Sequence, residues 1–311
     1  MTTITAPDGP YVFPSFREPA CSGRIEVPEG ATAHVGLSYM LSDGYRELGM
    51  DVYVPSDRTQ PAPCVIWIHG GAWLNGDRRY VPDIWPAGEP FGSLIRRGYA
   101  VATIDYRHSR EAAFPAQLHD AKAAVRYLRH FAEELGIDPT RLAVWGESAG
   151  GHLAALVGLV GTRADLEGGV GVGGKDSAVS AVVDWYGVSD VAAMPSLVDS
   201  LPNDAMASNP GVTIEEPIDV MLAGAHDRAA AERDFSPVSH VSASAPPFLL
   251  VHGDADRLVP VEQSRQLHDR LRQAGASAAL HIVPGADHVW IGAEFEPLVA
   301  EAIDFLDSVL R

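Results

Sequence analysis

Ser148 lies in the sequence GESAGG, residues 146–151, which fits the pattern G-x-S-x-G. A serine hydroxyl becomes an effective nucleophile when an imidazole takes its proton and a carboxylate orients that imidazole. At a sharp turn from a strand into a helix, flanking glycines make room for the strained serine backbone. The pattern therefore predicts that Ser148 is the nucleophile of an acyl transfer. We expect the amide of Ala149, at the start of the helix, to stabilise the negative charge that develops.

The base and the acid are predicted on two loops further along the chain. His288 follows a predicted strand over 279–283, in the sequence GADHVW, and Asp256 follows a predicted strand over 248–251, in HGDADRLVP. The chain order Ser, Asp, His is the one that strand-turn-helix nucleophiles use. Asp254 follows the same strand as Asp256. We favour Asp256 because it precedes the turn into the next helix, and we expect Asp254 to shape that turn.

The other residues considered as base or acid are less well placed. Asp287 is adjacent to His288, and neighbouring side chains on a loop rarely point together. Four other histidines are assigned to predicted helices or strands and not to a loop at a strand end, namely His119, His130, His152 and His281. His288 is therefore the predicted general base.

Backbone donors for an oxyanion are predicted in the sequence HGGAW, residues 69–73, at the end of another predicted strand. Glycine exposes backbone amides without steric hindrance, so we expect the amide of Gly71 and that of either Gly70 or Ala72 to join Ala149. Trp73 and Glu147 are assigned to substrate binding. For Trp73, a tryptophan packed in the core is the alternative interpretation.

The elements that must position these residues follow an alternating pattern. Continuously apolar runs such as CVIWIH, AVATID and FLLVH are typical of parallel strands buried on both faces. Strands are predicted over 48–54, 64–69, 100–105, 142–145, 181–185, 248–251 and 279–283. Helices are predicted over 117–134, 149–160, 263–274 and 295–310, with Asp138 and Pro139 as a stop after the first. The fold class is therefore α/β, a mostly parallel sheet flanked by helices.

The chain is predicted to form a single domain over 1–311, with an N-terminal segment over about 1–45. Residues 187–246 interrupt the alternation with short helical fragments and no clear strand, separated by Pro195, Pro202, Pro210 and Pro217. Because ligands of open α/β sheets bind outside the carboxyl ends of the strands, this insertion is well placed to form a small helical cap. Met194, Leu197 and Leu201 are candidates for its wall.

Composition excludes several other functions. The 311 residues carry a formal charge of −18, whereas binding a phosphate backbone depends on clustered Lys and Arg, so nucleic acid is not an expected partner. No apolar run is long enough for membrane insertion. The first residues lack the basic region and apolar core of a secretory signal, so a cytoplasmic location is expected. Of two cysteines, Cys21 and Cys64, the second begins an apolar run and is predicted to be a buried thiol.

Patterns for cofactors and metals are weak or missing. The sequence GVGVGG, residues 169–174, has the spacing of a dinucleotide fingerprint, but it precedes a predicted strand where a true fingerprint follows one. We therefore expect a loop. Neither C-x-x-C nor H-E-x-x-H occurs, so no metal and no cofactor are predicted.

Taken together, HGGAW and GESAGG resemble the hormone-sensitive-lipase-like branch of the α/β-hydrolase superfamily, near small carboxylesterases and kynurenine formamidases. The resemblance runs from about residue 48 to the end of the chain and includes DYR at 105–107, Phe114-Pro115, Ser236-Pro237 and HGDADRLVP. The lipase-like branch usually has a third glycine where this chain has Ala72, and the formamidases usually have tyrosine. The subgroup is therefore not fixed by these motifs.

The resemblance implies a serine carboxylesterase that acts on a small-molecule ester, typically with a short acyl chain, without metal or organic cofactor. Some members of the superfamily act on acetyl or feruloyl esters of plant cell walls. It also allows a homodimer formed through an edge strand. The alternative activity is amide or formamide hydrolysis, as in an arylformamidase, and a further alternative is a ligand-binding member of the fold that has lost catalysis.

Overall fold

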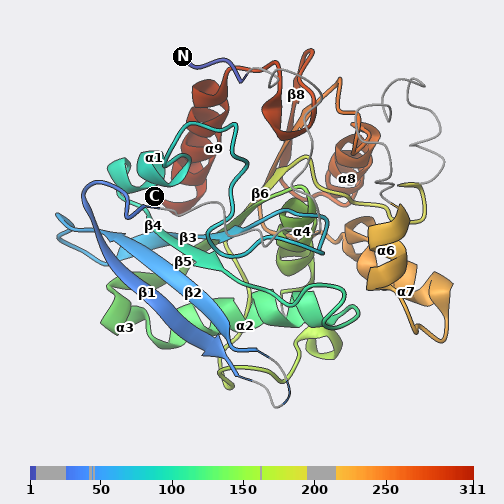
Figure 1. The fold of residues 1–311 in the computed structure, drawn as a ribbon, viewed down its shortest axis with the longest axis horizontal. Coiled ribbons are helices and arrows are strands. Elements are labelled where there is room, and N and C mark those ends of the chain that lie inside the picture. Colours follow the sequence, from blue (N-terminus) through green and yellow to red (C-terminus); the bar gives the residue numbers. More distant parts are fainter. Residues whose placement is uncertain (5–25, 42–43, 45, 162, 195–214) are drawn as a thin grey trace.

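The computed structural model describes residues 1–4, 26–41, 44, 46–161, 163–194 and 215–311. Within them, eight strands form one sheet in the order β1-β2-β4-β3-β5-β6-β7-β8. The pairs β1·β2 and β2·β4 are antiparallel, and every pair from β4·β3 to β7·β8 is parallel. Helices cover both faces of the sheet (Figure 1). The predicted α/β class is confirmed.

Seven of the eight strands coincide with predicted ones, and four of the seven are buried at every position. The strands are β1 (Ala31–Met40), β2 (Leu48–Pro55), β3 (Ala62–Ile68), β4 (Ala100–Ile104), β5 (Ile137–Glu147), β6 (Ala181–Trp185), β7 (Phe248–Gly253) and β8 (Ala278–Val283). β1 was not predicted. It is an edge strand whose side chains are mostly half-buried or exposed, so its sequence lacks the apolar run that marks the inner strands.

The helices predicted over 149–160, 263–274 and 295–310 are present, the one predicted over 117–134 is divided, and α1 (Phe91–Arg96) was not predicted. The other helices are α2 (Ala116–His130), α3 (Ala132–Leu135), α4 (Ala149–Val160), α6 (Glu215–Met221), α7 (Arg228–Phe235), α8 (Glu262–Gln273) and α9 (Phe295–Leu310). The single helix predicted over 117–134 is divided, because the chain turns at Phe131. The stop is Gly136 in a left-handed conformation, and Asp138 and Pro139 already belong to β5.

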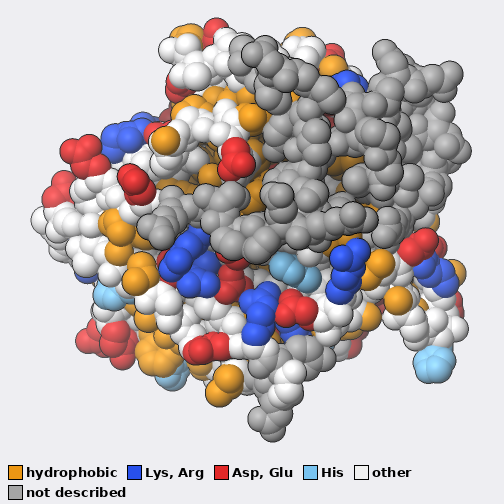
Figure 2. All heavy atoms as spheres, viewed as in Figure 1, with side chains coloured by type: hydrophobic (Ala, Val, Ile, Leu, Met, Phe, Trp, Pro, Cys, Tyr) orange, Lys and Arg blue, Asp and Glu red, His pale blue; other side chains and the backbone are white. Residues whose placement is uncertain are grey.

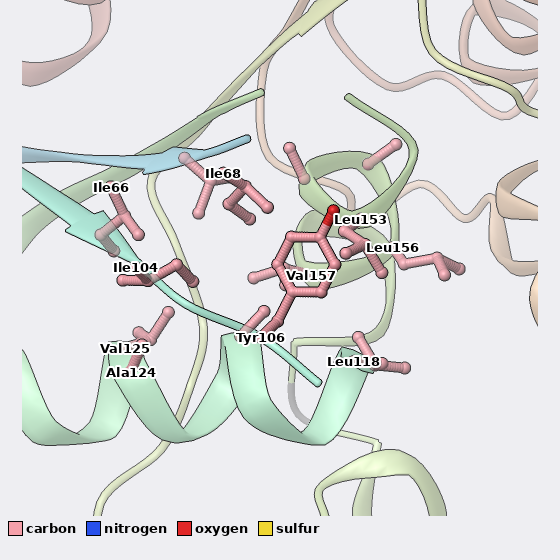
Figure 3. Close-up of a cluster of buried hydrophobic side chains, with 14 of the residues drawn as sticks. Ile66, Ile68, Ile104, Tyr106, Leu118, Ala124, Val125, Leu153, Leu156 and Val157 are labelled. Carbon is pink, nitrogen blue, oxygen red and sulfur yellow. The ribbon is translucent and has the colours of Figure 1, made fainter. Parts of the chain in front are cut away.

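Two hydrophobic layers pack on opposite faces of the sheet. Along β3, Ile66 and Ile68 face one layer, while Val65 and Trp67 face the other, as the period of two in a strand requires. The first layer contains α2, α4 and α8, and the second contains α1 and α9. Figure 3 shows part of the first layer, where Tyr106 lies among aliphatic side chains from β3, β4, α2 and α4.

Several predicted local features are present. Residues 169–174 form a loop, as expected, and Arg126 on α2 donates hydrogen bonds to the carbonyls of Glu167, Val170 and Val172. Cys64 is a buried free thiol whose pKa burial raises to about 12, whereas Cys21 lies outside the described residues.

The described part of the 187–246 insertion contains α6, α7 and a 3₁₀ turn, η3 (Pro237–His240), without a strand. Pro217, predicted to separate helical fragments, lies within the first turn of α6, where a proline is tolerated. Of the proposed cap-wall residues, Met194 is fully buried in the core, and Leu197 and Leu201 lie outside the described residues. No helix in the described residues is both long and apolar enough to cross a membrane.

Charged side chains of both signs lie side by side on the face shown in Figure 2. Two arginines pair with buried aspartates. Arg78 contacts Asp51 at 3.0 Å and Asp105 at 2.9 Å, and Arg79 contacts Asp51 at 2.9 Å. Because Asp51 lies on β2 and Asp105 directly follows β4, these pairs fasten the loop after HGGAW to the antiparallel edge of the sheet.

Candidate active site

Ser148 lies at the turn between β5 and α4, with φ 54° and ψ −120°. A positive φ is unusual for a residue with a side chain and is one of the strained conformations found at functional sites. Two glycines make the turn possible. A Cβ on Gly146 would collide with the carbonyl oxygen of Gly150, and a Cβ on Gly150 would collide with that of Ile68. These positions therefore need glycine for the close approach of backbone to backbone.

Ser148, His288 and Asp256 form one hydrogen-bonded chain. The distance from His288 Nε2 to Ser148 Oγ is 3.1 Å, and that from His288 Nδ1 to Asp256 Oδ2 is 2.7 Å. Because a carboxylate only accepts, Nδ1 carries the proton and donates to Asp256, which leaves Nε2 of the neutral ring to accept from the serine hydroxyl. The structure thus brings together three side chains that come from the ends of β5, β7 and β8.

The carboxylate of Asp256 is buried and held by donors on both oxygens. Oδ1 accepts from the amides of Leu258 and Val259, each at 2.8 Å, and Oδ2 accepts from His288. Burial alone would raise the pKa of Asp256, but the charge of His288 and hydrogen bonds from the histidines around it hold that pKa well below its usual range. In turn, burial works to lower the pKa of His288, and Asp256 outweighs it and raises that pKa.

Asp254 and Asp287 do not contact His288 as Asp256 does; they join the two loops. Asp254 Oδ1 accepts from the amide of Gly285 at 2.6 Å. Asp287 accepts from the Arg257 amide at 2.9 Å and from its Nε at 2.6 Å, and also caps the amide of His288 at 2.8 Å. Asp254, predicted to shape its own turn, therefore links that turn to the neighbouring loop.

The loop that carries His288 is fixed by unusual backbone geometry and by tryptophan packing. Val289 and Trp290 both have positive φ, 56° and 69°. The indole N–H of Trp85 donates to the carbonyl of Val289 at 3.0 Å. Trp185 packs edge-on against both Trp85 and Trp290, at 5.5 and 5.2 Å between ring centroids. These contacts hold in place a backbone that would otherwise relax.

The HGGAW loop is oriented by Tyr106, whose hydroxyl donates to the carbonyls of His69 at 3.0 Å and Gly70 at 3.2 Å. In a trans peptide the carbonyl and the following N–H point in opposite directions, so the amides of Gly70 and Gly71 face away from Tyr106. The amide of Gly70 donates to Glu147 Oε1 at 2.7 Å. Gly70 is therefore not available as an oxyanion donor, which corrects one of the two predicted alternatives.

Gly71 and Ala72, the other predicted donors, form a tight turn. The carbonyl of Gly71 accepts from the amides of Leu74 and Asn75, both at 3.0 Å. Gly71 has φ +97° and Ala72 has φ 54°, which is the region that favours glycine. The conformation that a third glycine would adopt is thus kept although the residue is alanine. Ala149, the remaining predicted donor, is the first residue of α4, where amides have no acceptor within the helix.

Glu147, predicted to bind substrate, is 2% exposed and links the elbow to the HGGAW loop through Gly70. Burial raises the pKa of Glu147 to about 7, while the charge of His288, the Gly70 amide and the Tyr186 hydroxyl act in the opposite direction. A side chain with so little exposed surface does not contact a substrate. Glu147 instead interacts with Gly70 and, through its charge, with His288.

Trp73 is packed in the core, as the alternative interpretation proposed, and this corrects its assignment to substrate binding. It is 1% exposed, and its indole N–H donates to His152 Nδ1 at 3.2 Å. His152 Nε2 in turn donates to the carbonyl of Phe235 at 2.7 Å, and Phe235 packs against Trp73 with 5.2 Å between centroids. His152, set aside as a candidate base, thus ties the HGGAW loop and the elbow helix to α7.

Sequence reasoning missed two further residues that support the site. Arg107 is buried and forms a two-pronged pair with Asp120 on α2, with contacts of 2.6 and 2.8 Å. The only signal for it was its place in the DYR motif. His252 lies within HGDADRLVP, and its Nε2 is 3.2 Å from Asp256 Oδ2. Among the described residues, no three His, Cys, Asp or Glu side chains are grouped as a metal ion would need.

The sheet topology and the strained elbow together define an α/β-hydrolase. The chain belongs to the BD-FAE family, whose model matches residues 50–271. Among curated proteins it is 32% identical over 308 residues to Esterase LipQ of Mycobacterium tuberculosis, covering 93% of this chain and 67% of LipQ.

The chain is also similar to solved structures of esterases. The chain superposes with a TM-score of 0.75 and 32% identity on a truncated form of a carbohydrate esterase from gut microbiota, covering 91% of this chain and 99% of the other. A thermophilic esterase of the Planctomycetes species Thermogutta terrifontis, Est2 with propionate bound, gives a TM-score of 0.69 and 25% identity, covering 90% and 95%.

LipQ and both solved structures are esterases by name, and the comparisons place the chain among them. The chain spans 67%, 62% and 51% of the lengths of three curated relatives.

Proposed function

We propose that this chain cleaves carboxylic esters with short acyl groups through an acyl-enzyme on Ser148. The observation that carries the proposal is the continuous hydrogen-bonded chain from Ser148 through His288 to Asp256, with distances of 3.1 and 2.7 Å. Distances in this range are those of a nucleophile, its base and an orienting acid.

In the first half-reaction, Ser148 Oγ attacks the ester carbonyl carbon while His288 Nε2 takes the hydroxyl proton. The carbonyl π electrons move to the oxygen, and the amides of Gly71, Ala72 and Ala149 are the proposed donors to that oxyanion. Collapse of the tetrahedral intermediate breaks the bond to the alcohol oxygen, to which His288 returns the proton. Asp256 stabilises the imidazolium while it exists.

In the second half-reaction, water takes the place of the alcohol. His288 removes a proton from the water, the hydroxide oxygen attacks the acyl carbon, and the proton then passes to Ser148 Oγ as the acid leaves. The depressed pKa of Asp256 keeps it ionised throughout, so it never competes for this proton.

The preference for short acyl groups is proposed from the relatives. The Thermogutta terrifontis esterase binds propionate, a three-carbon acid. We also propose that the described part of the insertion, residues 187–194 and 215–246, supports the site through α7. Phe235 supports this role, because it is fully buried against Trp73 and His152, directly behind the HGGAW loop and the elbow helix.

The test compares wild type with Ser148→Ala on p-nitrophenyl acetate, butyrate and longer esters. The expected results are hydrolysis that declines with acyl length and a loss of at least about 10⁴-fold in kcat for the variant, as for triad nucleophiles. A fluorophosphonate probe should label the wild type and not the variant. Equal thermal unfolding of the two proteins is the control. Turnover retained by the folded variant would refute the assignment, and faster cleavage of aryl formamides than of esters would move the activity to amides.

A further inference from the structure

Asp256 contacts a second imidazole besides that of His288. His252, in β7, is fully buried, and its Nε2 is 3.2 Å from Asp256 Oδ2 and 2.8 Å from the carbonyl oxygen of Val259. Its Nδ1 is 2.7 Å from Ser264 Oγ on α8. The reaction itself does not require His252. Its Nε2 nevertheless lies next to the carboxylate that orients the catalytic base.

The partners of His252 determine which nitrogen carries its proton. Both groups near Nε2, a carbonyl and a carboxylate, only accept hydrogen bonds, so Nε2 must carry a hydrogen, which Val259 accepts at 2.8 Å and which lies beside Asp256 Oδ2 at 3.2 Å. Ser264 can donate to Nδ1 because a hydroxyl can serve as either donor or acceptor. Both nitrogens of the neutral ring therefore have a hydrogen-bond partner, and the Nε2–H group lies next to Asp256.

We propose that His252 is a positioning residue, which holds the triad carboxylate in the rotamer that receives His288. The proposal rests on the proposed function. The terminal torsion of an aspartate is broad, so a carboxylate held at one oxygen can still turn. Here the amides of Leu258 and Val259 hold Oδ1, while His252 and His288 approach Oδ2 from two directions. Without the His252 N–H, Asp256 Oδ2, the oxygen that accepts from His288, is held less firmly.

His252 also has an electrostatic consequence that a purely structural residue would not have. Its N–H shares Oδ2 with His288 and withdraws charge from it, so the carboxylate attracts the His288 proton less strongly than it would alone. Loss of the His252 donor should therefore raise the pKa of His288. The other polar groups that face His252 are Asp184 on β6, through its charge, and Tyr186, whose ring centroid is 6.4 Å away.

The experiment compares His252→Asn with His252→Gln. The asparagine amide ends near the position of Nδ1 and cannot reach Asp256, whereas the glutamine amide extends to about the position of Nε2 and keeps a donor. For His252→Asn we expect kcat/KM on p-nitrophenyl butyrate to fall about tenfold to a hundredfold, the effect of removing one hydrogen bond to a charged group, mainly in kcat. The acid limb of its pH profile should move to higher pH. His252→Gln should recover most of the rate.

The controls separate this inference from the proposed function and from misfolding. His281→Asn makes the same change on β8, where the ring is half-exposed and pairs with Glu301, and should leave activity unchanged. Rates are given per site titrated with fluorophosphonate, so unfolded protein does not count. Turnover by Ser148→Ala would refute the proposed function. An inactive Ser148→Ala beside a His252→Asn of wild-type rate and unmoved pH limb would overturn the His252 role alone, as would equal losses in the Asn and Gln variants.

A measurement on the wild type keeps the proposal testable if His252→Asn does not fold. Proton-coupled nitrogen NMR of ¹⁵N-histidine-labelled protein reports which ring nitrogen of His252 is protonated. A proton on Nε2 is the expected result. A neutral ring protonated at Nδ1 would overturn the proposal, since Nε2 could then donate to neither Asp256 nor Val259.

Discussion

Glu147→Gln tests how the buried carboxyl beside the nucleophile affects stability. In the folded protein its pKa is raised from 4.5 to about 7, so the folded state binds a proton that the unfolded state has released between these pH values. The free energy of unfolding therefore falls as pH rises through this window, and the loss is complete above about pH 7. A shift from 4.5 to about 7 corresponds to about 3 kcal/mol.

The glutamine side chain does not ionise and keeps an oxygen for the Gly70 amide. We expect Glu147→Gln to gain up to about 3 kcal/mol over the wild type as pH rises from about 4.5 to about 7, and to hold that gain above it. Urea unfolding of both proteins at several pH values measures the difference. The raised pKa of Asp184 contributes to both proteins and cancels in the comparison. Stability curves that stay parallel from pH 4.5 to 8 would refute the reasoning.

The same variant should change catalysis in a defined direction. The charge of Glu147 contributes to raising the pKa of His288, and catalysis needs His288 in its neutral form. Without that charge the pKa of His288 falls, so the acid limb of kcat/KM should move to lower pH in Glu147→Gln. A limb that stays in place or moves to higher pH would contradict the Coulomb coupling between these two residues.

Three other substitutions follow from the geometry. Asp256→Asn should lower kcat by about 10⁴-fold with little change in fold, because an amide favours the wrong tautomer of His288; rates on p-nitrophenyl acetate and circular dichroism check this. Gly253→Ala should lower both Tm and activity, because its Cβ would collide with the carbonyl of Ala286 and push apart the two catalytic loops; a wild-type Tm would contradict this. Trp73→Phe should destabilise the fold by about 1–3 kcal/mol in urea, because it leaves His152 Nδ1 buried without its donor.

The sequence predicted those parts of the fold and site that depend on local composition. The inner strands are buried on both faces, so their sequences are continuously apolar and easy to recognise. The elbow was predicted because two glycines are needed by backbone contacts only a few residues away or on the neighbouring strand. Where a residue's role depends on partners far away in the sequence, the local motif did not predict that role.

The assignment of Gly70 shows this limit. A glycine after a strand suggests a free amide, but Tyr106, which follows another strand, orients the carbonyls of His69 and Gly70. The acceptor that occupies the Gly70 amide is Glu147, which is 77 positions away in the chain. Trp73 is similar, because its partner His152 lies on the elbow helix. No spacing rule within five residues encodes such contacts.

The three aspartates at the ends of β7 and β8 show how the loops can be rigid while one carboxylate remains available for chemistry. Asp254 and Asp287 accept hydrogen bonds from amides and an arginine of the opposite loop, whereas Asp256 accepts one from the imidazole of His288. Because the first two fix the distance between the loops, Asp256 does not have to hold them together and can keep its geometry as His288 gains and loses a proton. Loss of the hydrogen bond between Gly285 and Asp254 should therefore lower the catalytic rate by disordering His288. The pKa of His288 should not change.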